Sequence, residues 1–270
     1  MRKIFLSIIS TLVLSICLVF FGCSAKPQST PLSIAADLAQ ENKTPDTEIS
    51  PPSATLIPPS PKPPATPSID SATKPDSEEP VFFIEEIPEK IRTFMKGKTI
   101  YDNSPIGYDE LRYLTVTFWG YDSEPHLGNI IVNKAIADDT IAIFRTLLEH
   151  EFPIEKMLLP DYYDGNDELS MRNNNTSGFN DRPLEGTDTL SYHQLGLAID
   201  INPLYNPFIT YNTNKLEPST SEKYLDRSLS EKGMIVTDDI CVTTFKQYGF
   251  TWGGDWISMK DYQHFQISLD

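Results

Sequence analysis

Residues 191–203 read SYHQLGLAIDINP, and this stretch carries most of the information about the fold. Residues 197–201 (LAIDI) alternate between large apolar side chains and others. An alternation of period two predicts a short strand, with Asp200 on the face opposite the large apolar residues. His193 lies just before this strand. The stretch therefore brings an imidazole and a carboxylate to one short segment.

A second short strand is predicted near the end of the chain, at residues 264–267 (HFQI). Phe265 and Ile267 face one way in such a strand, so His264 lies on the opposite, polar face. Asp261 lies three residues earlier. The end of the chain thus supplies a second imidazole with a carboxylate close to it in sequence.

His193, Asp200 and His264 together make a candidate zinc site. Imidazole and carboxylate groups both bind zinc, and three protein ligands leave a fourth position open for water, as catalytic zinc sites do. Asp261 could take a proton from that water. From the spacing alone, structural histidines remain the alternative, because short motifs often match by chance.

An aromatic turn, WGGDW, occupies residues 252–256. Trp252 and Trp256 flank two glycines, which allow a close approach of the backbone to its neighbours. We expect both tryptophans to line a substrate groove. The alternative is an aromatic turn that packs on the core.

The three motifs SxHxxGxAxDxNP, WGGxW and DxxHF occur in this order and resemble those of VanY-type D-alanyl-D-alanine carboxypeptidases and the related L-alanyl-D-glutamate endopeptidases. That family belongs to one superfamily with lysostaphin and the hedgehog fold. Residues 170–183 (SMRNNNTSGFNDRP) are similar to the stretch that precedes the first zinc ligand in one branch of the family. The resemblance covers the last 190 residues or so of the chain.

The resemblance implies roles for individual residues. The positions that match the zinc ligands are His193, Asp200 and His264. Asp261 matches the general base, which is Glu in the better known members. Arg182 matches an arginine that holds a substrate carboxylate or polarises the scissile carbonyl, with Arg172 as a competitor, and Ser191 matches a residue of the substrate groove.

The implied activity is the zinc-dependent hydrolysis of peptidoglycan stem peptides. The bond could be D-Ala-D-Ala or L-Ala-D-Glu, and the sequence leaves this choice open. A non-catalytic zinc-containing module that binds wall peptides or a protein partner is the alternative from another class, because fold alone does not fix function.

Helices and strands mix without a regular βαβ rhythm, so the predicted fold class is α+β, with a small antiparallel sheet and flanking helices. The resemblance assigns it to the hedgehog and DD-peptidase type of zinc peptidase domain. The sequence predicts helices at residues 87–95, 133–151 and 238–248, strands at 113–118 and 156–159, and a polar, Asn-rich loop at 162–188.

The N-terminal residues 1–22 predict a secretory signal, with a short basic head followed by an apolar run. The run ends in Gly22 and Cys23, which resembles the lipobox of bacterial lipoproteins, where the cysteine is lipidated and becomes the first residue. An uncleaved signal anchor is the alternative. Either way, we expect the rest of the chain to be exported, anchored to a membrane, and to face the cell wall or periplasm.

Cys23 and the residues that follow it to position 80 are predicted to form a lipidated linker. Residues 24–80 hold more than half of the 22 prolines of the chain and contain no glycine and no aromatic residue. Such a composition favours an unfolded and extended segment. At about 3.1 Å per residue it could reach roughly 180 Å. The zinc peptidase domain is then expected to cover residues 81–270.

The charge of the chain excludes one class of partner. Lys and Arg number 22 against 38 Asp and Glu, for a formal net charge of −16. Nucleic-acid binding requires a basic surface, so we expect no nucleic-acid partner. We expect a monomer. Because Cys17 lies in the predicted signal and Cys23 is the predicted lipid site, Cys241 is the remaining cysteine of the sequence. We expect it to be a buried packing residue.

Overall fold

The computed structural model describes residues 79–182 and 190–269, which belong to one compact unit. The predicted signal peptide and Cys23 lie outside the described residues. The helices are α1 (Glu89–Met95), α2 (Ala137–Glu149), α3 (Asp167–Arg172) and α4 (Ile240–Gln247). Short 3₁₀ turns are η1 (Tyr108–Glu110), η2 (Lys134–Ile136), η3 (Pro160–Tyr163), η4 (Tyr192–Leu195), η5 (Glu222–Leu225) and η6 (Gly253–Asp255).

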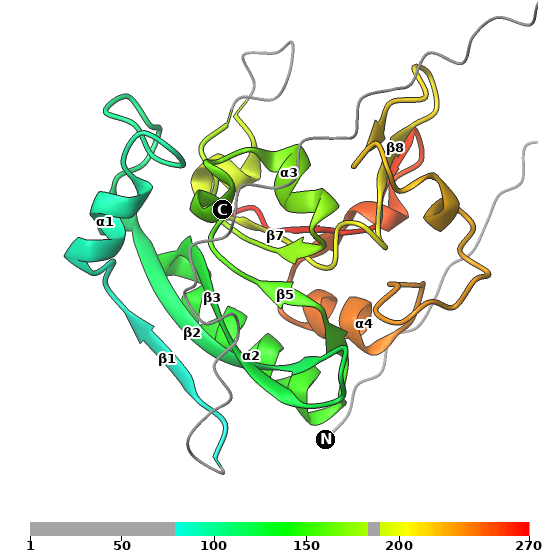
Figure 1. The fold of residues 1–270 in the computed structure, drawn as a ribbon, viewed down its shortest axis with the longest axis horizontal. Helices are drawn as coiled ribbons and strands as arrows, with labels where there is room; N and C mark the ends of the chain where they lie inside the picture. The colour runs from blue at the N-terminus through cyan, green and yellow to red at the C-terminus, as the bar shows by residue number, and fades with distance from the viewer. Residues whose placement is uncertain (1–78, 183–189, 270) are drawn as a thin grey trace, which may run out of the picture. The chain divides into compact units, whose positions relative to one another are not determined.

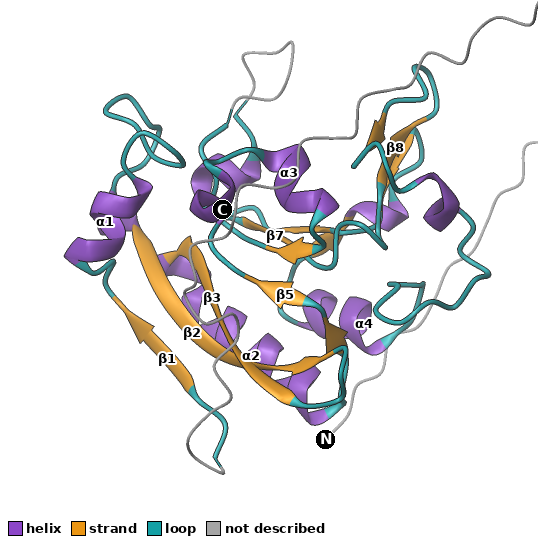
Figure 2. Ribbon diagram, in the orientation of Figure 1, coloured by secondary structure: helices purple, strands orange, loops and turns teal. Residues whose placement is uncertain are grey.

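The strands are short except for two. They are β1 (Phe82–Glu85), β2 (Leu111–Gly120), β3 (Pro125–Asn133), β4 (Pro153–Ile154), β5 (Lys156–Met157), β6 (Asn175–Thr176), β7 (Ala198–Asp200), β8 (Phe208–Thr210), β9 (Leu216–Glu217), β10 (Thr251–Trp252), β11 (Met259–Asp261) and β12 (His264–Gln266). Figures 1 and 2 show their arrangement with the helices.

The largest sheet has the order β1-β2-β3, with antiparallel neighbours, and β4 pairs with β2 in parallel. The predicted strand at residues 113–118 is the centre of β2. Leu114, Val116 and Phe118 alternate along it and are all buried in the main core. Full burial of a side chain of this size contributes roughly 1.5–3 kcal/mol, so this face holds the sheet against the helices.

Helix α2 packs on β2, and its start follows the predicted cap (Figure 1). Asn133 Oδ1 accepts a hydrogen bond from the Ala135 backbone N–H at 3.0 Å, which confirms Asn133 as the cap of the helical segment. Phe144 and Leu147 are buried on the side that faces the core. The predicted helix at residues 133–151 thus exists as a 3₁₀ turn followed by α2.

The second sheet has the order β10-β12-β7 and is antiparallel throughout. Helix α4 covers it, and Phe265 of β12 stacks on Phe245 of α4 at a ring-centroid distance of 4.0 Å. Asp239 caps this helix, Gly249 ends it at φ 85°, and Cys241 is buried within it as predicted. Small antiparallel sheets with flanking helices confirm the α+β prediction.

The Asn-rich segment at residues 162–188 is not a plain loop in its described part. It contains α3 and β6. Asparagine side chains in this segment form hydrogen bonds with backbone N–H and C=O groups that would otherwise lack a partner. Asn166 caps α3 through the Leu169 N–H. Asn175, which is fully buried, accepts from the Leu158 N–H at 2.8 Å and donates to the Leu158 carbonyl at 2.9 Å. Buried side-chain amides of this kind escape a prediction based on polarity.

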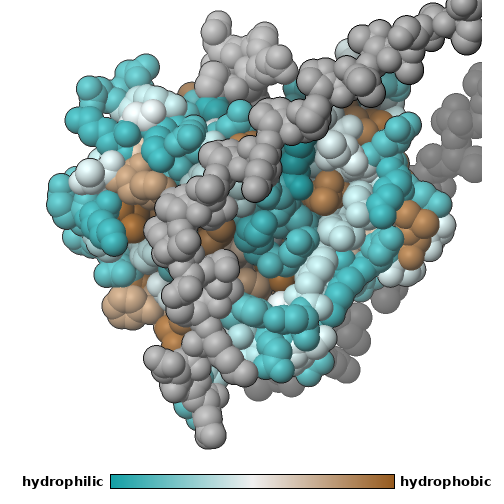
Figure 3. Space-filling model, in the orientation of Figure 1, coloured by the Kyte–Doolittle hydropathy of each residue, from teal (hydrophilic) through white to brown (hydrophobic). Residues whose placement is uncertain are grey.

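Two further sheets lie in the described part of the chain, the three-stranded β11-β8-β9 and the parallel pair β5-β6. The described residues that are visible in Figure 3 are mostly hydrophilic, with hydrophobic side chains in separate groups. Among the helices of residues 79–182 and 190–269, none has the length and apolar character needed to cross a membrane.

Candidate active site and metal centre

His193 lies in the turn η4, which its neighbours fix at both ends. Ser191 Oγ accepts a hydrogen bond from the His193 backbone N–H at 3.1 Å, and Gln194 Oε1 accepts from the Ser191 N–H at 2.8 Å. This reciprocal cap satisfies N–H groups that the turn leaves free. Gly196 ends the turn at φ 65°, where a Cβ would lie 2.7 Å from the Asn133 backbone nitrogen. The local sequence therefore fixes the position of His193.

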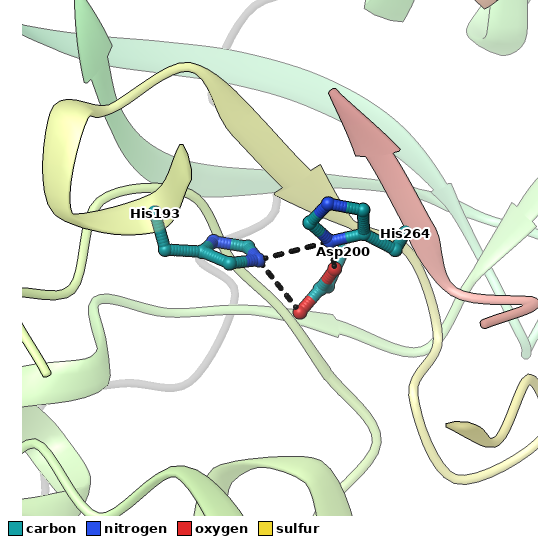
Figure 4. A group of neighbouring side chains, drawn as sticks. All are labelled: His193, Asp200 and His264. Carbon is teal, nitrogen blue, oxygen red and sulfur yellow. Dashed lines mark hydrogen bonds and ion pairs between the residues drawn. The ribbon is translucent and has the colours of Figure 1, made fainter. Parts of the chain in front are cut away.

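Asp200 and His264 come from neighbouring strands and meet His193 at one point (Figure 4). Asp200 Oδ1 lies 3.0 Å from His264 Nδ1, and Asp200 Oδ2 lies 3.2 Å from His193 Nε2. The two ring nitrogens, His193 Nε2 and His264 Nδ1, are 3.2 Å apart. The three side chains are buried, each less than a tenth exposed. The structure thus brings together the predicted metal ligands.

The outer ring nitrogens set the tautomer of each histidine. His193 Nδ1 lies 2.7 Å from the Gly178 carbonyl oxygen, and His264 Nε2 lies 2.9 Å from Gln266 Oε1. Both partners are acceptors, so both outer nitrogens carry the hydrogen and donate it. The inner nitrogens of the neutral rings then present lone pairs to the centre, as metal-binding histidines do.

The centre has the geometry and the charge that a divalent cation requires. Two lone pairs and a carboxylate converge with mutual distances of 3.0–3.2 Å. Ligands of a tetrahedral zinc ion, with bonds of about 2.0–2.1 Å, lie about 3.3 Å from one another. Within residues 79–182 and 190–269, His193, Asp200 and His264 form the group whose potential ligand atoms all lie within 4.8 Å. These residues therefore fit such an ion.

Without a cation, a proton takes its place. Burial alone would raise the pKa of Asp200, but His193 and then His264 lower it below its ordinary value. Burial alone would lower the pKa of His264, but the hydrogen bond to Asp200 and its charge raise that pKa to about 9. In the metal-free protein His264 therefore keeps a proton near neutral pH, which a metal ion would displace.

A pocket of about 530 Å³ opens in front of this group. Its wall includes predicted site residues, namely Arg182, Ser191, His193, Asp200, Trp256, Asp261 and His264. Apolar side chains form other parts of the wall, among them Met171, Leu190, Phe208 and Met259. A mostly apolar pocket with a few convergent polar groups is the usual form of a small-molecule or peptide site.

Asp261 ends strand β11 and lines the pocket. Its Oδ1 atom is buried and has no hydrogen bond. Burial raises the pKa of Asp261 to about 7, with His264 lowering it and Asp200 raising it. The turn at Gly253 allows this placement, since a Cβ there would lie 2.6 Å from the Asp261 carbonyl oxygen. A carboxyl group with a pKa near neutrality is suited to accept and return a proton.

Of the two candidate arginines, Arg182 lines the pocket and Arg172 does not. Arg182 Nη2 lies 2.5 Å from Asp167 Oδ2, and Arg182 Nε is buried with no partner. Arg172 is exposed and pairs with Glu168 at 2.8 Å. The geometry favours Arg182 as the residue that meets a ligand.

The two tryptophans differ in their surroundings. Trp256 lines the pocket, and its ring centroid lies 5.6 Å from that of His264. Trp252 is not part of this pocket. It is 2% exposed, stacks on Phe265 and donates from Nε1 to the Tyr262 carbonyl oxygen at 2.9 Å. Trp252 therefore packs in the core and does not line the predicted groove, because β10 packs against α4.

Sequence reasoning missed pocket residues that lie in other motifs or in none. Asp167 pairs with Arg182, while Glu217 and Gln263 also line the pocket. Asp167 and Glu217 are far from the histidine motifs in sequence and carry no local signal. Gln266, the partner of His264, could have been found from the sequence, because it lies two residues after His264 and therefore on the same face of the strand.

A mixed fold with a buried His-Asp-His group in the wall of a pocket suits a metallopeptidase. Residues 185–267 match the sequence family described as D-alanyl-D-alanine carboxypeptidase. His193, Asp200 and His264 all lie within the matched residues. Comparison with curated proteins gave no match, and neither did comparison with solved structures. The family favours an enzyme over a non-catalytic module.

Proposed function

We propose that this protein hydrolyses a peptide bond in peptidoglycan stem peptides, with a zinc ion held by His193, Asp200 and His264. The observation that carries the proposal is the convergence of these three groups at 3.0–3.2 Å within a pocket that also holds Asp261. When bound, zinc polarises a carbonyl oxygen and makes a water molecule a competent nucleophile near neutral pH.

Asp261 moves the proton. Its buried Oδ1 atom has no hydrogen-bond partner, so it is free to accept the proton of the attacking water and to return it to the leaving amine. A burial-raised pKa makes this carboxylate a stronger base than an exposed Asp. Proton uptake by the amine completes the cleavage of the C–N bond.

Arg182 holds the substrate. Asp167 pairs with Nη2 of its guanidinium, and the buried Nε group has no hydrogen-bond partner. A planar guanidinium binds a carboxylate through parallel hydrogen bonds and binds a carbonyl oxygen through one. Asp167 orients the arginine, and Arg182 in turn orients the stem peptide against the metal centre.

The matched family points to the terminal D-alanyl-D-alanine bond as the substrate bond. The L-alanyl-D-glutamate bond is the competing possibility that the sequence raised. The experiment is to incubate the protein with a defined pentapeptide stem, with and without a chelator, and to weigh the products. Loss of one alanine supports the carboxypeptidase, and separation of the first residue from the second supports the endopeptidase. An intact peptide in the presence of added zinc contradicts both.

We also propose that the protein is an exported lipoprotein, because Gly22 and Cys23 follow an apolar N-terminal run. Lipid attached at Cys23 would anchor it, since two acyl chains suffice for stable membrane attachment. Cys23→Ser should release the protein from membranes and remove the mass of the acyl groups. Retention of the variant in the membrane fraction would support the signal anchor instead.

A further inference from the structure

Gln263 lines the candidate active site and has a buried side-chain oxygen without a partner. The residue is 2% exposed and lines the pocket of about 530 Å³. Its Oε1 atom is buried and accepts no hydrogen bond, whereas its backbone oxygen accepts one from the Ile201 N–H at 3.0 Å. A buried acceptor that is left unpaired is destabilising, so its presence calls for a physical explanation.

Other buried side-chain amides in the described part of the chain show what the fold does when an amide has a structural role. Gln194, 6% exposed, accepts from the Ser191 N–H and donates to Asp181 Oδ1 at 2.7 Å. Asn175 is likewise bonded at both ends. Asn180 also leaves its oxygen free, but it does not line the pocket. Gln263 thus differs from these amides: its buried oxygen has no partner, and the residue lines the pocket.

Two further unpaired atoms belong to the same pocket. Arg182 Nε is a buried donor and Asp261 Oδ1 a buried anionic acceptor. The other carboxylates of the wall are engaged: Asp167 with Arg182, Glu217 with Lys215 at 3.0 Å, and Asp200 with the two histidines. Gln263 therefore adds a neutral acceptor to this set. A neutral, buried carbonyl oxygen suits a neutral N–H donor, such as that of a peptide unit.

We propose that Gln263 is a specificity-determining residue, whose Oε1 accepts a hydrogen bond from a backbone amide N–H of the peptide substrate. The inference rests on the proposed function, because it takes the stem peptide as the ligand. A site that is built to bond an N–H rejects an analogue that lacks it, because the protein acceptor then stays unpaired. Gln263 would accordingly make the enzyme select peptides against their ester analogues at one position.

The first test compares stability with activity in Gln263→Met, which keeps the length of the side chain and removes the acceptor. Removal of an unpaired buried oxygen should raise the Tm of the peptide-free protein by about 2–4 °C. The same change should lower kcat/KM for the stem peptide by about 10- to 100-fold, with zinc content unchanged. Gln263→Leu serves as a second variant with the same expectations.

Gln194→Met is the matched control for stability. It removes an amide that is bonded at both ends, so its Tm should fall. A Tm that falls to the same extent in Gln263→Met, together with unchanged kcat/KM, would show that Gln263 has a structural role and would overturn the inference.

The second test identifies the substrate N–H. One amide of the stem peptide at a time is replaced by an ester, with the scissile bond left intact. One such replacement should lower kcat/KM of the wild type, and the same replacement should have little further effect in Gln263→Met, because the two changes remove the same hydrogen bond. If the loss in kcat/KM from each ester replacement adds in full to the loss from Gln263→Met, the proposal is contradicted.

The two proposals can fail separately. If the wild-type protein leaves the unmodified stem peptide intact, the proposed substrate is wrong and this inference falls with it. If the wild type and Gln263→Met cleave the peptide equally well, the proposed function stands and the role of Gln263 alone is refuted.

Discussion

Asp200 and His264 are direct neighbours across the antiparallel pair of β7 and β12, and Asp200 Oδ1 lies 3.0 Å from His264 Nδ1. The register of one small sheet therefore fixes two of the three candidate ligands. A slip of one residue would turn a ligand to the other face, so the core packing of Ile199 and Phe265 also specifies the metal centre. The capped turn at His193 adds the third ligand from a separate segment.

Zinc affinity should rise with pH. In the metal-free protein the pKa of His264 is raised to about 9, so at pH 7 its ring carries a proton that a metal ion must displace. The dissociation constant should fall by up to about tenfold per pH unit below pH 9 and level off above it. Competition with a chelator of known affinity, from pH 6.5 to 9.5 or so, measures this. A flat profile would show that no such proton is displaced.

Asp261→Asn should lower kcat by about 10²- to 10⁴-fold and leave zinc bound, because the amide keeps the shape of the side chain but cannot accept a proton. In the wild type, activity should fall as the pH drops through a value at or below about 7, since a bound cation lowers the raised pKa of Asp261. The matched control is Asp255→Asn, an exposed residue paired with Lys246 at 2.7 Å. An unchanged kcat in Asp261→Asn would remove this residue from the mechanism.

Asp261→Glu tests whether the backbone position at residue 261 requires the shorter side chain of Asp. The better known relatives carry Glu at the matching position, so the chemistry alone would permit activity. In the described structure Gly253 lies tightly against Asp261, which leaves little freedom for the backbone to retreat. We expect kcat to fall by about tenfold or more, because misplacement of a catalytic group by about 1 Å is costly. Wild-type turnover would indicate a tolerant site.

Gly253→Ala should impair turnover without loss of zinc. The new Cβ would lie 2.6 Å from the Asp261 carbonyl oxygen and 2.7 Å from its Cβ, so the backbone of β11 must shift. We expect a loss in kcat of about tenfold or more, since Asp261 would move away from its position. Gly107→Ala is the control, because a Cβ there meets nothing within 4 Å. Equal kcat values for the two variants would argue against this coupling.

Arg182→Lys should lower kcat/KM by about 10- to 100-fold. Lysine keeps the charge beside Asp167 but lacks the planar fork, so the substrate loses a charge-assisted hydrogen bond. Arg172→Lys should stay within about twofold of the wild type, because Arg172 is outside the pocket. The reverse order of the two variants would reassign the substrate contact to Arg172.

The sequence predicted those parts of the site that depend on local periodicity. The alternation around Asp200 and His264 placed both on strands, and the structure pairs these strands in register. The same rule located β2 and α2, whose apolar faces form the core. Patterns of this kind follow from the geometry of a single element, so one sequence is enough to find them.

Contacts between distant segments could not be predicted in this way. The pairing of Asp167 with Arg182 joins two segments that share no motif, and the free oxygen of Gln263 depends on what surrounds it. Trp252 shows the reverse problem. Its motif suggested a groove, but the ring packs against Phe265, because tertiary packing decides which face of a two-residue strand is buried.

Metal content is the most direct test of the central claim, that His193, Asp200 and His264 hold the zinc ion required for hydrolysis. Native mass spectrometry of the zinc-loaded protein, with turnover of a stem peptide measured on the same sample, gives both quantities. We predict one zinc ion per chain in the wild type, and loss of both zinc and turnover in His264→Ala, because removal of one of three ligands destroys most of the binding free energy. Stoichiometric zinc in His264→Ala, or turnover by a zinc-free wild-type protein, would contradict the account.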